Sequence, residues 1–427
     1  MREFHESVKE HLPVEEFTLN VLFLSELFYP HGGGAELATY LYAKLLSQAG
    51  VNVVVVTNWF AGEPETYKEQ KLRIYRLPLF EKKVSTKYSI FLKIDALFSS
   101  FIRNLIRKTD VVYIPRFWYS SIPFAKLYRK PVVIHLHDYI PICPLSNLYD
   151  SSEGKTCSRR TGFCSMKCIY KWEKIQGRGL SETIYSVALN STLGKLWGEL
   201  VKLCDAIVCV SKTQGSIIAK TDPSLRSKIY TVYNPLPRIS CTEIEGDDFG
   251  YFGGPNYGKG FHVLYHAVKS INSKQSKKIN VHVTNFSNSP TRFLDKLCKT
   301  GFTPYGRLEE KLFEKIYRQL RCVVVPSIWP ETFSYVVVEA LLRGRLVIAS
   351  DIGAIPEVTS GCDGALLFSA GSVEQLMARL QHVKDLKKEA LVDLATRSRQ
   401  IIAKRFDNGK TVDDFLNLLS MISGGTH

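Results

Sequence analysis

Two glutamates, Glu331 and Glu339, stand eight positions apart in the second half of the chain. The apolar run 322–325 is typical of a buried strand that ends at Pro326, and the pattern that follows predicts a helix beginning near residues 332–334. Glu331 is therefore expected in a loop and Glu339 in the second turn of the helix. Amides at a helix start favour an anion, and an ionised carboxylate accepts strong hydrogen bonds. The alternative is a loop carboxylate and a surface carboxylate without a shared role.

Three glycines, Gly32, Gly33 and Gly34, lie between an expected strand at residues 20–24 and an expected helix at residues 35–48. Glycine lets the backbone approach a phosphate or a sugar closely at the start of a helix. The spacing is not G-x-G-x-x-G, so it does not favour a dinucleotide site. A flexible turn is the alternative interpretation of these glycines.

A histidine, His137, follows the expected strand at residues 132–136 and precedes Asp138. Side chains alternate along a strand, so His135 and His137 are expected on the same side of the sheet. His137 lies just past the end of the strand, where parallel sheets bind their ligands. A packing role is the alternative for a histidine at this position.

These residues are distributed over two series of alternating strands and helices. Buried strands are expected at 20–24, 52–56, 111–114, 132–136, 206–210 and 229–233, and then at 249–253, 279–284, 322–326, 346–350 and 365–368. Continuous apolar strands separated by helices are typical of parallel sheets covered on both faces. The sequence Asn-Pro-Leu-Pro at residues 234–237 and the polar stretch after it mark a domain boundary. The predicted fold is therefore α/β, with two doubly wound parallel-sheet, Rossmann-like domains facing a cleft.

Within this framework, residues 326–358 (PSIWPETFSYVVVEALLRGRLVIASDIGAIPEV) form a long and specific pattern. The pattern resembles the retaining glycosyltransferases of family four, which have the GT-B fold and an E-x7-E motif that matches Glu331 and Glu339. The resemblance implies that Glu331 contacts the donor sugar and that Glu339 binds the ribose of the nucleotide. It further implies that the donor is held by backbone amides around three residues, which are Thr332, Phe333 and Ser334.

The same resemblance extends to the sequence FGYFGGPNYGKGFHV at residues 249–263. Lys259 corresponds to the family's lysine on the donor diphosphate, where a cation stabilises charge on the leaving group. A solvated loop lysine is the alternative. Many relatives have an arginine where this chain has Gly254, so the second cation is not assigned, and Arg307 is a weak candidate. By resemblance, Gly33 and Gly34 border the donor diphosphate and acceptor, and His137 lies beside the donor sugar.

The resemblance implies an N-terminal acceptor-binding domain at residues 1–240 and a C-terminal nucleotide-sugar-binding domain at residues 246–410. A last helix in residues 411–427 is expected to cross back to the first domain. The implied activity is transfer of a hexose from a UDP- or GDP-sugar to a hydroxyl of a lipid-linked or saccharide acceptor, with retention of configuration. No catalytic metal is implied, and no Asp-x-Asp motif is found. The alternatives are an inactive sugar-nucleotide-binding protein and an enzyme like glycogen or sucrose synthase.

Ten cysteines are too few for a disulfide scaffold in a chain of 427 residues. Four of them fall within 26 residues, at Cys143, Cys157, Cys164 and Cys168. Four cysteines so close together are compatible with a structural zinc ion, although they lack paired C-x2-C spacing. Reduced thiols in an insert near the acceptor side are the alternative.

The chain carries a formal net charge of +15, which favours polyanionic partners. Basic residues are dense at 77–110 and 155–178, and a helix expected at about residues 87–107 places Phe91, Ile94, Phe98, Phe101 and Leu105 on one face. Such a face either binds an anionic membrane or packs on the sheet. No nucleic-acid motif is found. No apolar run spans a bilayer and residues 1–18 lack a signal-peptide pattern, so we expect a cytoplasmic protein, peripheral at most on the inner membrane face.

Overall fold

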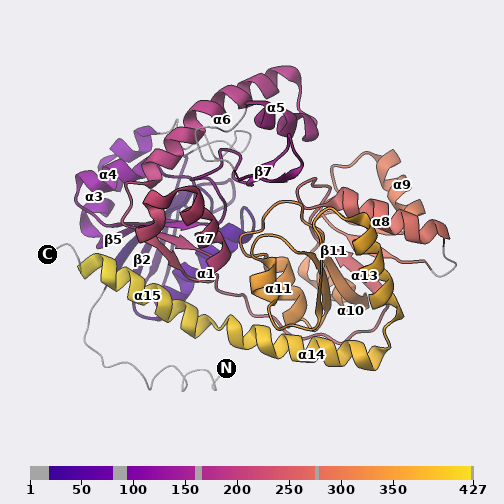
Figure 1. Ribbon diagram of the computed structural model, residues 1–427. Coiled ribbons are helices and arrows are strands. Elements are labelled where there is room, and N and C mark those ends of the chain that lie inside the picture. The colour runs from indigo at the N-terminus through magenta and orange to yellow at the C-terminus, as the bar shows by residue number, and fades with distance from the viewer. Residues whose placement is uncertain (1–18, 80–93, 159–165, 275–277, 425–427) are drawn as a thin grey trace.

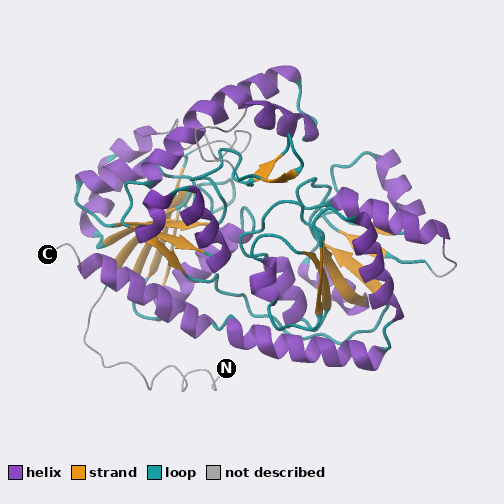
Figure 2. Ribbon diagram, viewed as in Figure 1, coloured by secondary structure: helices purple, strands orange, loops and turns teal. Residues whose placement is uncertain are grey.

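The computed structural model describes residues 19–79, 94–158, 166–274 and 278–424, which form two α/β domains that lie side by side (Figure 1). Each domain is built on its own largely parallel sheet with helices on both faces, as Figure 2 shows. The predicted fold class of two parallel-sheet domains is therefore confirmed.

The first domain contains an eight-stranded sheet in the order β10-β9-β6-β5-β1-β2-β4-β3. Every neighbouring pair is parallel except β3 and β4, which are antiparallel and were not expected from the sequence. The strands are β1 (Asn20–Leu24), β2 (Asn52–Asn58), β3 (Thr66–Glu69), β4 (Leu72–Leu77), β5 (Val111–Ile114), β6 (Val132–Leu136), β9 (Ala206–Cys209) and β10 (Ile229–Thr231). The helices outside the insert described below are α1 (Gly34–Gln48), η1 (Ile94–Phe98), α3 (Ser100–Lys108), α4 (Ser121–Leu127), α7 (Lys212–Thr221) and η2 (Pro223–Lys228).

The central strands of this sheet are buried on both faces. In β1, Leu22 belongs to the core under α3 and α4, whereas Phe23 belongs to the core under α1. Alternate side chains of a strand point to opposite faces, so a strand covered on both sides must be apolar throughout. This requirement explains the continuous apolar runs in the sequence.

The second domain has a six-stranded parallel sheet in the order β13-β12-β11-β14-β15-β16. The strands are β11 (Asp248–Tyr251), β12 (Val281–Val283), β13 (Phe302–Pro304), β14 (Leu320–Val325), β15 (Leu346–Ser350) and β16 (Ala365–Phe368). The helices are α8 (Phe261–Lys274), α9 (Thr291–Thr300), α10 (Glu310–Gln319), α11 (Tyr335–Leu342), α12 (Ile355–Thr359), α13 (Val373–Asp385) and α14 (Lys388–Arg405). Since β11 and β14 are neighbours, the loops that follow them lie at the same edge of the sheet.

An insert separates β6 from β9 in the first domain. It contains a small antiparallel pair, β7 (Tyr149–Asp150) and β8 (Lys155–Thr156), and two helices, α5 (Met166–Ile175) and α6 (Leu180–Val201). The insert extends above the first domain and reaches toward the second domain (Figure 1). Its cysteines are considered with the site.

The chain passes between the domains twice, once after β10 and once between α14 and α15 (Asn408–Gly424). The side-chain amide of Asn408 accepts a hydrogen bond of 2.8 Å from the backbone N–H of Leu236 and donates one of 2.8 Å to the carbonyl of the same residue. The two crossings are thus joined to each other. Beyond them, α15 packs on the first domain, where the ring of Phe415 lies 4.8 Å from that of Tyr42.

The amphipathic helix expected at residues 87–107 is only partly present, and its apolar face differs from the prediction. Residues 87–93 lie outside the described residues, and the rest divides into η1 and α3. In α3, Ile102 and Ile106 are buried, whereas Phe101 is exposed, as is Phe98 in η1. The N-cap at Ser99 starts a new helix and so changes the phase of the apolar pattern. Among the described helices, none has the length and apolar character needed to cross a membrane.

Candidate functional site

Lys259 and Glu331 form an ion pair where two loops of the second domain meet. Lys259 follows β11 and Glu331 follows β14, and the Lys259 Nζ lies 2.8 Å from Oε1 and 3.0 Å from Oε2 of Glu331. The two residues are 72 positions apart in the chain, and only the pairing of β11 with β14 brings them together. A cation and a carboxylate therefore converge at the edge of the sheet where parallel sheets bind ligands.

Glu331 is held in one orientation by three donors. In addition to Lys259, its Oε1 accepts hydrogen bonds from the Ser327 hydroxyl at 2.5 Å and from the Trp329 indole N–H at 3.2 Å. The residue is 8 % exposed. Burial by itself would raise the pKa of Glu331, but the Lys259 ammonium and the two neutral donors hold that pKa below its ordinary value. Glu331 is therefore an ionised, preoriented acceptor.

Two glycines permit these loops to approach closely. Gly260, next to Lys259, has φ +74°, and a Cβ there would lie 1.7 Å from the carbonyl oxygen of Pro326. Gly353, after β15, has φ +59°, and a Cβ there would lie 2.3 Å from the carbonyl oxygen of Glu331. Larger residues would separate the backbones at both positions, so Gly260 sets the distance between the lysine loop and the segment before Glu331, and Gly353 sets the distance between the loop after β15 and Glu331.

The start of α11 faces the first domain. Ser334, the residue before the helix, adopts a left-handed conformation with φ +70°. The Thr332 hydroxyl donates a hydrogen bond of 3.0 Å to the carbonyl of His137, and the Thr332 carbonyl accepts one of 2.8 Å from the Ser211 hydroxyl. Phe333 is buried beside these contacts. The segment predicted to hold the donor is therefore also the segment that contacts the other domain.

His137 carries a neutral imidazole at this contact. Its ring stacks on His135 with centroids 4.6 Å apart, as the alternation along β6 predicts. Burial, together with the positive charge of Arg116, lowers the pKa of His137 to about 3. Its Nε2 is buried and has no hydrogen-bond partner among the described residues. A neutral imidazole with an unused nitrogen can exchange a hydrogen bond with a hydroxyl-bearing ligand.

The glycine loop lies close to α11 but uses one of its amides internally. The N–H of Gly33 donates a hydrogen bond of 2.6 Å to the Glu36 carboxylate, which caps α1. A Cβ on Gly34 would lie 3.0 Å from the ring of Tyr335 at the start of α11. Gly34 thus marks a close approach between the two domains, whereas the amide of Gly33 is already satisfied in this structure.

Glu339 is not bonded to the ion pair in the described part of the chain. It sits half-buried on α11, and burial raises its pKa while Arg343, one turn later, partly offsets the shift. Within the described part of the chain, no hydrogen bond or ion pair joins Glu339 to Lys259 or Glu331. The structure therefore joins Lys259 to Glu331 and Thr332 to His137, and it shows no bond from Glu339 to either pair among the described residues. Arg307 is exposed.

A buried charge cluster that sequence reasoning missed lies beside His137. Arg116, in the loop after β5, forms ion pairs with Glu26, 3.3 Å away, and with Glu36. Burial raises the pKa of the fully buried Glu26, although Arg116 partly offsets this effect. The only signal in the sequence was that Glu26 and Arg116 each follow a buried strand. Their pairing depends on the neighbouring positions of β1 and β5.

A second missed residue is Glu357 on α12. Its carboxylate accepts hydrogen bonds from the backbone N–H groups of Lys212 (2.9 Å) and Thr213 (2.7 Å) at the start of α7, and from the hydroxyls of Thr213 and Tyr233. Burial would raise the pKa of Glu357, but these donors hold it below its ordinary value. Glu357 thus ties the second domain to the N-terminus of a helix of the first domain.

The insert of the first domain reaches the lysine loop. The ring of Trp172 on α5 lies 5.9 Å from that of Trp329, and the ring of Tyr149 on β7 lies 6.4 Å from that of Tyr257. The Lys259 ammonium lies over the face of the Trp329 ring, with its Nζ 5.5 Å from the ring centroid. The insert therefore packs on the residues that surround the ion pair.

Of the cysteines proposed as zinc ligands, Cys164 lies outside the described residues. Cys143 and Cys168 are buried, and Cys157 is half-buried. The described residues contain no group of three or more histidine, cysteine, aspartate or glutamate side chains close enough to share a metal ion. The four-cysteine site depends on Cys164 and therefore stays a prediction.

Each of the two domains matches a known protein family. Residues 32–237 match the family described as Glycosyltransferase Family 4, and residues 246–385 match Glycosyl transferases group 1. The chain is a family 4 glycosyltransferase. The glycosyltransferase is 23% identical over 364 residues to a protein named "Uncharacterized 42.6 kDa protein in cps region" of Klebsiella pneumoniae, covering 80% of this chain and 87% of that one.

This glycosyltransferase is also 22% identical over 385 residues to a subunit of the human phosphatidylinositol N-acetylglucosaminyltransferase, covering 85% of this chain and 68% of that one. Among solved structures it resembles sucrose-phosphate synthase from Thermosynechococcus elongatus, with a TM-score of 0.69 and 14% identity over 95% of this chain and 100% of that one. HepE from Anabaena, solved with UDP-glucose, gives a TM-score of 0.64 and 15% identity over 94% and 100% of the two chains. These likenesses establish the GT-B fold.

Proposed function

We propose that this glycosyltransferase moves a hexose from a UDP- or GDP-sugar to a hydroxyl of a lipid-linked or saccharide acceptor, with retention of the anomeric configuration. The observation that carries the proposal is the Lys259–Glu331 ion pair, held beside His137 through Thr332. One cation, one fixed carboxylate and one neutral imidazole are the groups that an activated sugar requires at its phosphate and hydroxyl ends.

In the proposed reaction, the bond between the sugar's anomeric carbon and the diphosphate oxygen breaks, and the acceptor oxygen bonds to the same carbon from the same face. The acceptor proton passes to the leaving diphosphate. Lys259 stabilises the negative charge that grows on that leaving group. In this structure the ammonium is paired with Glu331, and in the proposal the donor diphosphate shares it.

Glu331 and His137 orient the sugar in this proposal. The ionised carboxylate of Glu331 accepts hydrogen bonds from sugar hydroxyls, and the free Nε2 of His137 contacts the sugar from the other domain. Amides around Thr332, Phe333 and Ser334, with Gly33 and Gly34 across the cleft, border the donor. The Gly33 amide becomes available only if Glu36 releases it. Glu339 is assigned to the ribose by family resemblance.

The relatives agree with this substrate class. HepE was solved with UDP-glucose, and the name of the human relative specifies transfer of N-acetylglucosamine to phosphatidylinositol. We extend both facts to this chain only as support for a nucleotide-sugar donor and for an acceptor that includes lipids. Peripheral association with the inner face of a membrane belongs to the same proposal.

The test is incubation of purified protein with radiolabelled UDP- and GDP-sugars, in the presence of lipid extracts and of saccharide acceptors. We expect a radiolabelled product whose anomeric configuration, read by NMR, equals that of the donor. Lys259→Met and Glu331→Gln should each lower the transfer rate by about 10²–10³-fold. Lys269→Met and Glu309→Gln change exposed residues of the same domain and are the matched controls.

Three outcomes would contradict the proposal in different ways. A product of opposite configuration would exclude retention. Calorimetric binding of a nucleotide sugar with no turnover against any acceptor would identify a sugar-nucleotide-binding protein without transferase activity. Absence of binding to every nucleotide sugar would remove the donor site from Lys259 and Glu331 altogether.

A further inference from the structure

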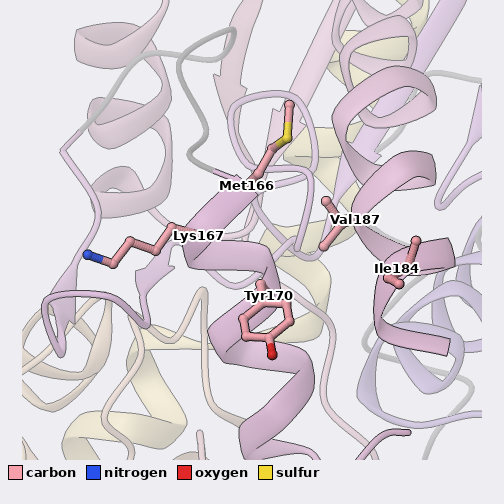
Figure 3. Close-up of a pocket in the computed structure, with 5 residues that line it drawn as sticks. All are labelled: Met166, Lys167, Tyr170, Ile184 and Val187. Carbon is pink, nitrogen blue, oxygen red and sulfur yellow. The ribbon is translucent and has the colours of Figure 1, made fainter. Parts of the chain in front are cut away.

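The two helices of the insert form a hairpin with an open apolar groove between them. The groove has a volume of about 340 Å³ and is lined by Met166, Lys167 and Tyr170 on α5 and by Ile184 and Val187 on α6. Figure 3 shows the apolar side chains of α5 and α6 around the groove, while the amino end of Lys167 points away from it. The lining is thus apolar, with a cation at its border.

The apolar residues around the groove are unusually exposed. Met166 is 66% exposed and Ile184 is 59% exposed. Next to Ile184 on α6, Tyr185 is 63% exposed, and Leu180 at the start of that helix is 61% exposed. Large apolar side chains that gather on one surface mark a contact site in a folded protein, whereas single ones do not. This cluster therefore indicates a surface that binds a partner.

The opposite face of the hairpin is firmly packed. Ile169 and Trp172 of α5 are buried, and Trp172 contacts Trp329. On the α6 side, a Cβ on Gly198 would lie 2.9 Å from the carbonyl oxygen of Pro141, so the helix lies directly on the body of the domain. The hairpin is held by these contacts, and its outward groove faces away from them.

The outward surface of α5 is positively charged. Lys167, Lys171 and Lys174 are exposed along it. The acidic residue of this helix, Glu173, is buried, accepts a hydrogen bond of 2.5 Å from the Ser186 hydroxyl and pairs with Arg178 at 2.9 Å. The exposed part of α5 therefore combines lysines with large apolar side chains and presents no carboxylate.

We propose that the α5–α6 hairpin docks on an anionic lipid bilayer, with its apolar groove at the acyl boundary and its lysines at the headgroups. Lysine side chains can keep their ammonium groups at the polar level while their stems cover apolar surface. An anionic bilayer complements both properties of this surface. In a dimer formed through this surface, the lysines of the two copies would face each other and repel, which disfavours a second copy of this chain as the occupant. The inference rests on the proposed function, because it assigns the membrane association proposed there to one surface outside the donor site.

The test is co-sedimentation of the full chain with vesicles containing about 30% phosphatidylglycerol in phosphatidylcholine, compared with pure phosphatidylcholine vesicles. We expect binding to the anionic vesicles that weakens as salt is added. The variant Tyr170→Ser/Ile184→Asn should bind at least about tenfold more weakly, since it removes apolar area from the groove. The matched control is Leu312→Asn, at an exposed leucine of α10 in the other domain.

A second pair of variants tests the charge. Lys167→Gln/Lys171→Gln should weaken binding by about fivefold for each lysine. Lys269→Gln/Lys274→Gln on α8 removes the same charge from another exposed helix and should change binding much less. Circular dichroism melts and calorimetry with a nucleotide sugar, run on every variant, show that the fold and the donor site are unchanged.

The proposal is overturned if the wild-type protein ignores anionic vesicles at low salt, or if both hairpin variants bind as tightly as their controls. It is also overturned if light scattering shows a dimer that Tyr170→Ser/Ile184→Asn dissociates while vesicles do not bind, since that result assigns the groove to a second copy. Nucleotide-sugar binding and sugar transfer are measured separately, so a failure here removes the membrane surface but leaves the donor site and the transferase activity of the proposed function standing.

Discussion

The hydroxyl of Thr332 donates a hydrogen bond of 3.0 Å to the carbonyl of His137, and the two residues belong to different domains. His137 directly follows β6 of the first sheet, and Thr332 precedes α11 of the second domain. This contact joins the two segments of the proposed site directly. It also implies that the position of the imidazole depends on how the domains meet.

Thr332→Val should lower the transfer rate while leaving thermal stability nearly unchanged. Valine keeps the shape of threonine but cannot donate to the His137 carbonyl, so one net hydrogen bond, worth about 1 kcal/mol, is lost from the assembled site. A decrease of about fivefold in kcat is expected. Thr192→Val, at an exposed threonine of α6, is the control. Equal rates in the two variants would show that this contact does not position the site.

The stability contributed by His137 should decline in mildly acidic solution. Its pKa is about 3 in the folded protein and about 6.5 in the unfolded chain, so between these values the unfolded chain binds more protons. The contribution is complete above pH 6.5 and decreases as the pH falls toward 3. The free energy of unfolding, measured with denaturant from about pH 7 to about pH 4, should therefore fall less steeply in His137→Gln than in His382→Gln, at an exposed histidine. Identical slopes would contradict the buried, neutral imidazole.

Glu357→Gln should weaken the contact between the domains. It should also make the free energy of unfolding depend less on pH in the acidic range. The glutamine oxygen cannot replace two carboxylate oxygens that accept from Lys212, Thr213 and Tyr233. The pKa of Glu357 is lowered in the folded state, so its contribution is present above the pKa of the unfolded chain and is lost as the pH falls through the folded value. We expect about 1–3 kcal/mol of destabilisation at neutral pH.

The measurement for Glu357→Gln is urea unfolding at about pH 7 and at about pH 4. Glu389→Gln, at an exposed glutamate of α14, is the matched control. The difference in unfolding free energy between the two variants should shrink at the lower pH. A difference that stays constant would show that the ionised form of Glu357 is not what stabilises the contact.

Gly260→Ala should destabilise the second domain more than Gly361→Ala, which costs only the strain of placing alanine in a left-handed backbone conformation. Gly361 has φ +73°, almost the same as Gly260 at +74°, but a Cβ on Gly361 meets no atom within 4 Å. Gly361→Ala therefore measures the conformational cost alone, about 1–2 kcal/mol. Gly260→Ala adds the clash with Pro326, and thermal melts should show a clearly lower Tm for it. Similar melting temperatures would mean that the lysine loop can move away without cost.

Phe415→Ala should destabilise the first domain by about 3–5 kcal/mol, because it removes a fully buried aromatic ring from its core. The ring contacts Tyr42 and Tyr113 although it belongs to the last helix of the chain. Met421→Ala, at an exposed position of the same helix, should cost much less. Equal effects in denaturant unfolding would show that α15 does not contribute to this core.

The sequence was sufficient for the fold and for part of the site. Lys259 and Glu331 each follow a strand that the sequence predicted, and the carboxyl ends of parallel strands lie at one edge of the sheet, so their neighbourhood was predictable. The pairing of Arg116 with Glu26 and Glu36 was not predictable, because it joins segments far apart in the chain. No periodicity of the sequence indicates such a contact. The single helix expected at about residues 87–107 is divided at Ser99, and Ile102 and Ile106 of α3 are buried in place of Phe98 and Phe101. Glu357 stood in the recognised segment, but its partners are in the other domain.

The reciprocal amide bonds between Asn408 and Leu236 have a mechanical consequence. Because the two interdomain crossings are bonded to each other at one place, that place can serve as a pivot once the other interdomain contacts, such as those of Thr332 and Glu357, have opened. Separation of the domains is then a rotation whose amplitude grows with distance from the pivot. If the backbone were cleaved after β10, the second domain would stay attached to the first through α15, which packs on the first domain. If it were cleaved between α14 and α15, the segment after β10 would still connect the two domains.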